Sequence, residues 1–142
     1  MRMLHYFIAG IFILTSSFYM SATEKEKPVS LYKTKWDLKK IQTDSGYTQV
    51  KTKAFLQLNE EKQSAGGNGS CNLFGGNFSV DKDKIHFGNL FSTKMYCPDV
   101  QPIENLYLHL LSIVDRFTIE GNQLKLYKGV DVQLVFEKNE NK

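Results

Sequence analysis

Hydrophobic and polar residues alternate with a period of two along most of the chain after residue 30. Such alternation predicts β-strands that bury one face. The first two segments, residues 31–41 and 53–58, are separated by an Asp-Ser-Gly turn at 44–46 and followed by a polar connector at 60–64. The side chains predicted to face the interior are Trp36, Leu38, Ile41, Ala54, Leu56 and Leu58.

The same alternation continues in the middle of the chain. Residues 77–80 are predicted to form a strand, and the charged sequence DKDK at 81–84 is predicted to turn the chain back. Ile85 and Phe87 then alternate with polar or small residues. This order predicts a second antiparallel hairpin.

Three alternating segments close the chain, separated by glycine turns at 121–122 and 129–131. Short turns between period-two segments predict an antiparallel meander. The apolar residues that alternate along these segments are Phe117, Ile119, Leu124, Leu126, Val132, Leu134 and Phe136.

The period changes from two to 3.6 after Pro102, which predicts an amphipathic helix. Pro102 suits the first helical position, and the acidic Glu104 suits the first turn. The polar residues Asn105, His109 and Ser112 fall on the face predicted to meet water. The apolar stripe consists of Ile103, Leu106, Tyr107, Leu110, Leu111 and Val114.

The N-terminal residues 1–22 have the order of a secretory signal peptide: a positive charge, an apolar run, and a small residue at 22 before a charged segment. The alternative is an uncleaved membrane anchor, since residues 4–22 approach the minimum spanning length. No cysteine near this point could carry a lipid anchor. We therefore predict an exported protein, periplasmic or secreted, with a flexible lead-in at 23–30 and a polar, frayed tail at 139–142.

The 142 residues are enough for one domain, and the formal net charge is only +3. Four lysines at positions 33, 35, 39 and 40 are the nearest approach to a basic stripe, and we interpret them as a solvated strand face. Nucleic acid is therefore not expected as a partner, because its recognition usually needs a basic stripe with aromatic platforms.

Cys71 lies in the glycine-rich sequence GGNGSCNLFGGNF at 66–78, and Cys97 ends the sequence TKMYC at 93–97, one strand-length segment later. In an exported protein an even number of cysteines favours a disulfide. The alternatives are a metal pair or a reactive thiol, but no CxxC sequence and no histidine at ligand spacing accompany them. The glycines at 66, 67, 69 and 76 are expected to adopt positive φ and to allow close backbone approach; an anion-binding nest is the alternative use.

The motif residues around these cysteines also resemble a known family. The patterns Cys-Asn-x-Phe-x-Gly-x-Phe at 71–78 and Thr-x-Met-x-Cys at 93–97, with Glu104 opening the helix, resemble the META domain of HslJ-like heat-shock and envelope proteins. The resemblance covers about residues 31–138. Its motif residues in this chain are Cys71, Asn72, Phe74, Gly76, Phe78, Thr93, Met95, Cys97 and Glu104.

The resemblance implies a small α+β domain, with an antiparallel, partly barrel-like sheet and one helix packed on it. It also implies an exported envelope protein, often stress-associated, with no established catalytic activity. From the export signal, the disulfide-braced sheet and the dispersed carboxylates, we expect a non-enzymatic protein without a cofactor that binds an unidentified protein or envelope component. Thr93 and Met95 are expected to position the second loop and to fill the core beneath it, and Asn72 to bond loop backbone. The alternative function is a carrier of small apolar ligands, with a pocket at the barrel mouth lined by Phe74, Phe91 and Tyr96.

Overall fold

The computed structural model describes residues 28–140, which form one helix and nine strands. The predicted signal peptide at 1–22 and residues 23–27 of the lead-in lie outside the described residues, as do 141–142. In chain order the elements are β1 (Trp36–Thr43), β2 (Gly46–Gln49), β3 (Phe55–Asn59), β4 (Ser64–Asn68), β5 (Leu73–Asp81), β6 (Lys84–Ser92), α1 (Gln101–Ile113), β7 (Arg116–Glu120), β8 (Gln123–Lys128) and β9 (Asp131–Lys138).

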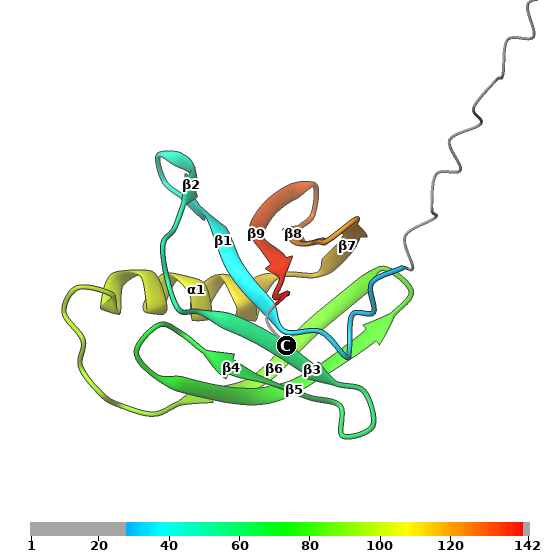
Figure 1. Cartoon of the computed structure of the whole chain (residues 1–142), viewed down its shortest axis with the longest axis horizontal. Coiled ribbons are helices and arrows are strands. Elements are labelled where there is room, and N and C mark those ends of the chain that lie inside the picture. The colour runs from blue at the N-terminus through cyan, green and yellow to red at the C-terminus, as the bar shows by residue number, and fades with distance from the viewer. Residues whose placement is uncertain (1–27, 141–142) are drawn as a thin grey trace, which may run out of the picture.

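All the strand pairings are antiparallel, and the sheet curls into a ring (Figure 1). From β3 to β9 each strand pairs with the next, and β1 closes the ring by pairing with both β3 and β9. The short strand β2 pairs with β1 alone and extends the sheet beyond the ring. This arrangement confirms the α+β fold with a barrel-like antiparallel sheet and a single packed helix.

The interior of the ring is filled by the residues that the period-two pattern places inward. Trp36, Ile41, Leu134 and Phe136 are fully buried. The Trp36 indole also satisfies its N–H by donating to the Leu31 carbonyl oxygen at 3.0 Å. The burial of Trp36 therefore leaves no unpaired donor in the interior. An unpaired buried N–H would cost free energy.

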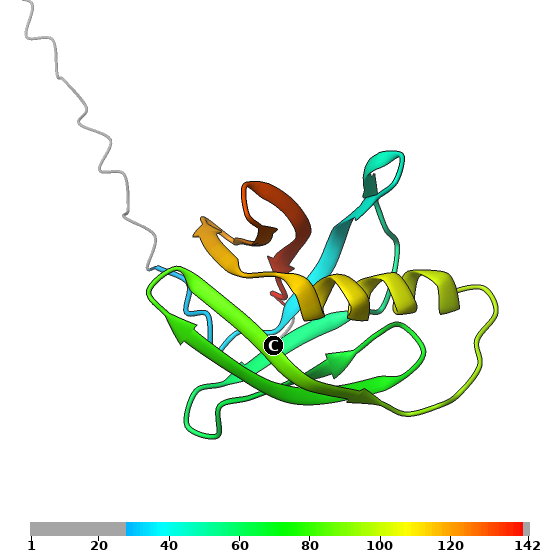
Figure 2. The ribbon, with the colours of Figure 1, turned by 180° about the vertical axis from the view of Figure 1, so that it is seen from behind.

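The helix α1 packs against the barrel through its apolar face and contacts β6 and β9 (Figure 2). The buried ring of Tyr107 meets the rings of Phe74 and Phe136 edge-on, with centroids 5.7 and 6.0 Å away. Burial raises the pKa of its phenol, whose hydroxyl donates to the Phe55 carbonyl oxygen at 3.4 Å. The helix begins one residue before Pro102, which is therefore not its first residue.

Two strands differ from the sequence prediction, because both contain glycine, which is also the usual sign of a turn. The segment Ser64–Asn68, expected to open a glycine corner, is strand β4 in register with β3 and β5. The segment Gly46–Gln49 is strand β2. The first predicted strand also begins late, at Trp36 rather than residue 31.

The expected positive φ angles at glycines 66, 67, 69 and 76 are wrong, since positive φ occurs instead at Gly46, Gly121 and Gly129 among the described glycines. In β4, glycine is required at position 67 because the backbone of the paired strand β3 approaches it closely. A Cβ on Gly67 would lie 2.0 Å from the Phe55 carbonyl oxygen on the paired strand. The backbone spacing at this point therefore leaves no space for a side chain.

The ends of the described chain are tied to the barrel. Val29, in the predicted lead-in, packs against the core. The predicted frayed tail is ordered at its first residue: the Asn139 backbone N–H donates to the Lys35 carbonyl oxygen at 2.8 Å, and its side-chain amide donates to the Asp37 carboxylate at 2.6 Å. Pairing with β1 thus continues past the end of β9.

Candidate functional site

The motif residues meet where the β4–β5 loop, the segment after β6 and the first turn of α1 come together. A disulfide joins Cys71 to Cys97, with their Cα atoms 6.0 Å apart. Beside it, hydrogen bonds link Asn72 to Thr93, Met95 and Glu104. We call the six residues Cys71, Asn72, Thr93, Met95, Cys97 and Glu104 the clasp. In this disulfide neither cysteine is free to bind a metal or to react as a thiol.

Glu104 is the centre of the clasp, and only 2% of it is exposed. One carboxylate oxygen, Oε2, accepts hydrogen bonds from the backbone N–H groups of Cys71 at 3.0 Å and Asn72 at 2.7 Å. The other, Oε1, accepts from the side-chain amides of Asn72 at 2.6 Å and Gln101 at 3.3 Å. Four donors from two separate segments thus converge on one carboxylate.

The negative charge of Glu104 is held without a basic partner in the described part of the chain. The ion pairs there are Lys125–Glu120 and Lys128–Asp115, both at the surface. Burial raises the pKa of Glu104, but hydrogen bonds from the Asn72 side chain and backbone, the Cys71 backbone and Gln101 lower it, and the net pKa is below its ordinary value. The first turn of a helix also favours a negative charge. Glu104 is therefore ionised at neutral pH.

The side chain of Asn72 is fully used within the protein. Its Oδ1 accepts from the Thr93 hydroxyl and from the Met95 backbone N–H, both at 2.8 Å. Its Nδ2 donates to the Met95 carbonyl oxygen at 2.9 Å and to Glu104. An amide has two donor hydrogens and one acceptor oxygen, and all of them are engaged here. Asn72 thus joins loop to loop and has no polar group left for a ligand.

Gly69 makes room for the Glu104 carboxylate. A Cβ at this position would lie 2.6 Å from Oε2 and 2.7 Å from Cγ of Glu104. The Gly69 backbone N–H also donates to the Asn72 carbonyl oxygen at 2.7 Å, closing the loop. Glycine is needed at position 69 because the Glu104 carboxylate occupies the space of a side chain, and not because of a positive φ angle.

The remaining motif residues, Phe74, Gly76 and Phe78, lie in β5 and contribute to the packing of the barrel. Phe74 and Phe78 are buried in the core, and Gly76 lies opposite a bulge in β6. A Cβ on Gly76 would lie 2.7 Å from Leu90 Cδ2. The expectation that Met95 fills the core is wrong: the residue is 60% exposed, and only its backbone is hydrogen-bonded to Asn72.

The expected apolar pocket lined by Phe74, Phe91 and Tyr96 is not formed. Phe74 points into the core, whereas Phe91 and Tyr96 are 70% and 78% exposed. Phe91 pairs with Gly75, the neighbour of Phe74, and its ring covers the position where a Gly75 Cβ would be. Neighbouring strand residues face opposite sides of a sheet, so Phe74 and the ring on Gly75 cannot line one pocket.

Four apolar residues on the segments around the clasp are exposed to solvent: Leu73, Phe91, Met95 and Tyr96. Leu73 is 60% exposed and lies on the same face of β5 as Gly75, which Phe91 covers. The Thr93 N–H donates to the Leu73 carbonyl oxygen at 3.0 Å, and this bond brings the segment after β6 alongside. We call Leu73, Phe91, Met95 and Tyr96 the apolar patch.

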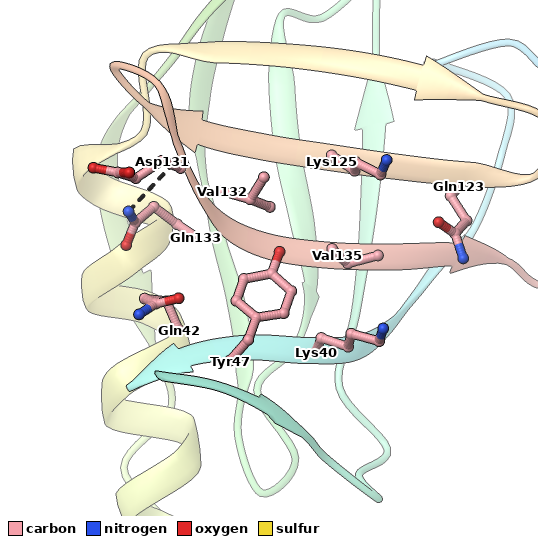
Figure 3. Close-up of a pocket in the computed structure, with 9 residues that line it drawn as sticks. All are labelled: Lys40, Gln42, Tyr47, Gln123, Lys125, Asp131, Val132, Gln133 and Val135. Carbon is pink, nitrogen blue, oxygen red and sulfur yellow. Dashed lines mark hydrogen bonds between the residues drawn. The ribbon is translucent and has the colours of Figure 1, made fainter. Parts of the chain in front are cut away.

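A polar hollow lies elsewhere, on the outer face of the sheet formed by β1, β2, β8 and β9 (Figure 3). Its volume is about 590 Å³. It was not predicted, because its side chains come from strands distant in sequence and include the unpredicted β2. It is lined by Lys40, Gln42, Tyr47, Gln123, Lys125, Asp131, Val132, Gln133 and Val135.

Residues 28–140 contain neither a cluster of metal ligands nor a helix that could span a membrane. No three or more His, Cys, Asp or Glu side chains gather there closely enough to hold a metal ion. None of the helical structure in that range is long and apolar enough to cross a membrane.

Comparison with known proteins places this geometry in a family. The family model described as META domain matches residues 29–141. A protein from Burkholderia xenovorans, with a structure determined by NMR, is 27% identical; the match covers 78% of this chain and 85% of that one, with a TM-score of 0.65. A second protein with a structure determined by NMR is 20% identical; the match covers 75% of this chain and 90% of that one, with a TM-score of 0.57. At this identity the similarity supports the fold alone. No curated protein matches the chain.

Proposed function

The chain belongs to the META domain family, and from that premise we propose that it is an exported, non-enzymatic, stress-associated protein that binds another protein or component of the envelope. The observation that carries the proposal is the apolar patch: Leu73, Phe91, Met95 and Tyr96 are each at least 60% exposed, and they are held beside a disulfide. Large apolar side chains exposed on neighbouring segments are typical of interaction surfaces.

The residue types of the patch favour a protein partner. Tyr, Phe and Met are enriched at protein–protein interfaces, where aromatic side chains supply much contact area at low entropic cost. The disulfide supports export, because such bonds persist in oxidising compartments. The stress association rests on the family resemblance.

The non-enzymatic part of the proposal rests on how the motif's polar groups are used. The side chains of Asn72 and Glu104 form hydrogen bonds with each other, with loop backbone, and with the side chains of Thr93 and Gln101. Both cysteines are consumed by the disulfide. A nucleophile or general base needs a free group within reach of a substrate, and the clasp offers none.

Crosslinking in the native envelope tests the proposal. The wild-type chain should co-purify with a reproducible protein partner, and Met95→Ser with Tyr96→Ser should remove that partner. Val130→Ser is the matched control, since Val130 is 86% exposed on the turn between β8 and β9. Equal recovery with the patch variant and the control would rule out the patch as the binding surface.

A further inference from the structure

The polar hollow of Figure 3 is a groove open to solvent, with walls from two parts of the barrel. Residues of β1 and β2 form one wall, and residues of β8 and β9 form the other. Figure 1 shows the β1–β2 hairpin and the β8–β9 turn rising on the same side of the barrel. Val135 forms the floor and is only 4% exposed, although it lies on the outer face of the sheet.

Three glutamines line this groove with unused hydrogen-bond acceptors. Gln42, Gln123 and Gln133 each donate one hydrogen bond through Nε2, to the Thr43 carbonyl, the Glu137 carboxylate and the Asp131 carbonyl, at 3.2 to 3.4 Å. Within residues 28–140 none of their amide oxygens accepts a hydrogen bond. An amide presents a donor and an acceptor side by side, which matches the hydroxyl groups of a sugar.

The charges of the groove are unevenly placed. Figure 3 shows Lys40 and Lys125 on either side of β9 at one end, with Asp131 at the other. Lys125 is paired with Glu120 at 2.6 Å, whereas Lys40 forms no ion pair within the described residues. An anionic group is therefore favoured at the lysine end, mainly by Lys40.

Tyr47 adds an apolar face and a further donor. It projects from β2 over the groove and is 43% exposed. The pKa of the Tyr47 phenol is raised to about 12, mainly by partial burial and to a smaller extent by the nearby Tyr127. The hydroxyl therefore keeps its proton at neutral pH, and the ring can lie against the C–H face of a sugar.

We propose that this groove binds a saccharide that carries a carboxylate, with its hydroxyl groups at the glutamine amides and Tyr47 and its carboxylate at Lys40 and Lys125. A nucleic acid strand fits less well, because it needs several uncompensated cations and stacking platforms. The groove shares no residue with the apolar patch, so this inference is independent of the proposed protein partner.

Two sources offer this chemistry: polymers of uronic acids, and peptide-free glycan strands, in which the lactyl carboxylate of N-acetylmuramic acid is not blocked by an amide bond to a peptide. The test is an NMR titration of the mature chain with trigalacturonic acid, with the disaccharide of N-acetylglucosamine and N-acetylmuramic acid, and with neutral maltotriose. At least one acidic probe should shift the groove amides with a Kd of about 1 mM or tighter. Whichever acidic probe binds more tightly identifies the source.

Two substitutions distinguish a specific contact at Lys40 from a general electrostatic attraction between the acidic probe and the lysines of the protein. Lys40→Gln should weaken binding of the acidic probe by roughly tenfold, as expected for a lost charged hydrogen bond. Lys62→Gln, which removes an exposed lysine in the β3–β4 turn, is the matched control and should leave the Kd unchanged. Dispersed NMR spectra will show that both variants are folded.

Three results would overturn the proposal: no shift with either acidic probe, equal binding of maltotriose, or equal affinity for the Lys40→Gln variant and its control. Shifts confined to residues outside the groove would overturn it as well. None of these results would alter crosslinking through Met95 and Tyr96, which tests the protein partner separately.

Discussion

Asn72 and Glu104, thirty-two positions apart in the sequence, are bonded to each other twice. The backbone N–H of Asn72 donates to Oε2 of Glu104 at 2.7 Å, and the side-chain amide of Asn72 donates to Oε1 at 2.6 Å. The same Asn72 amide holds both backbone groups of Met95. One carboxylate on the helix thus fixes the β4–β5 loop and, through it, the segment that carries Met95 and Tyr96 of the apolar patch.

Replacing the Glu104 carboxylate by an amide should destabilise the fold. In Glu104→Gln an amide N–H₂ faces the N–H donors that the carboxylate accepted, so one or more buried donors lose their partner. We expect the free energy of unfolding to fall by about 2–3 kcal/mol. Urea unfolding followed by the fluorescence of the buried Trp36 measures this. Glu61→Gln, at an exposed turn position, should stay within about 0.5 kcal/mol of wild type, and an equal loss in both variants would contradict the role of Glu104.

The same carboxylate should make stability depend on pH in the acid range. Its pKa in the folded state is below the ordinary value of 4.5, which stands for the unfolded chain. Its contribution is therefore complete above about pH 4.5 and is lost as the pH falls through the folded pKa. The stability difference between wild type and Glu104→Gln should shrink below pH 4.5. Asp115 and Glu120 are common to both proteins and cancel in this difference; a constant difference from pH 7 to pH 3 would contradict the prediction.

Adding a methyl group at Gly69 should push the Glu104 carboxylate away. The new Cβ in Gly69→Ala would lie 2.6 Å from Oε2, and we expect a loss of about 1–3 kcal/mol in unfolding free energy. Gly88→Ala is the matched control, because nothing lies within 4 Å of its Cβ position. In a Glu104→Ala background the cost at Gly69 should largely disappear. An unchanged cost there would show that the strain has another cause.

Removing the disulfide should lower stability without changing the fold. Closing a loop of 26 residues is worth ~3.5 kcal/mol on the chain-entropy model. Cys71→Ser with Cys97→Ser should lower the Tm by on the order of 10 °C in a scanning calorimeter. Intact mass after alkylation, with and without reductant, shows whether the wild-type bond is formed in the exported protein. Two alkylated thiols before reduction would contradict it.

Periodicity was enough to predict the helix and most of the barrel, because each buries one apolar face. The buried strand residues Trp36 and Leu134 and the helical Tyr107 follow directly from that pattern. Strand β4 was missed because close strand packing at Gly67 needs glycine, which is also the usual sign of a turn.

The centre of the clasp was harder to predict, because an acid in a helix is ordinarily taken as exposed or as favourable to the dipole. One signal was available: Glu104 lies three and seven positions before the buried Tyr107 and Leu111, on the same helical face. A carboxylate there must be buried and hydrogen-bonded. Its partners come from loop backbone, which carries no periodicity, so the bonds themselves required the structure.

The claim that the clasp holds the surface beside it is tested most directly by amide hydrogen exchange in wild type and Glu104→Gln. The Cys71 and Asn72 N–H groups donate to Glu104, and the Met95 N–H donates to Asn72. Protection at these three amides should fall at least about tenfold more than in β8 and β9, which exchange through opening of the barrel. A fall by one common factor throughout the chain would contradict the account, because Glu104 would then stabilise the barrel without specifically holding the patch.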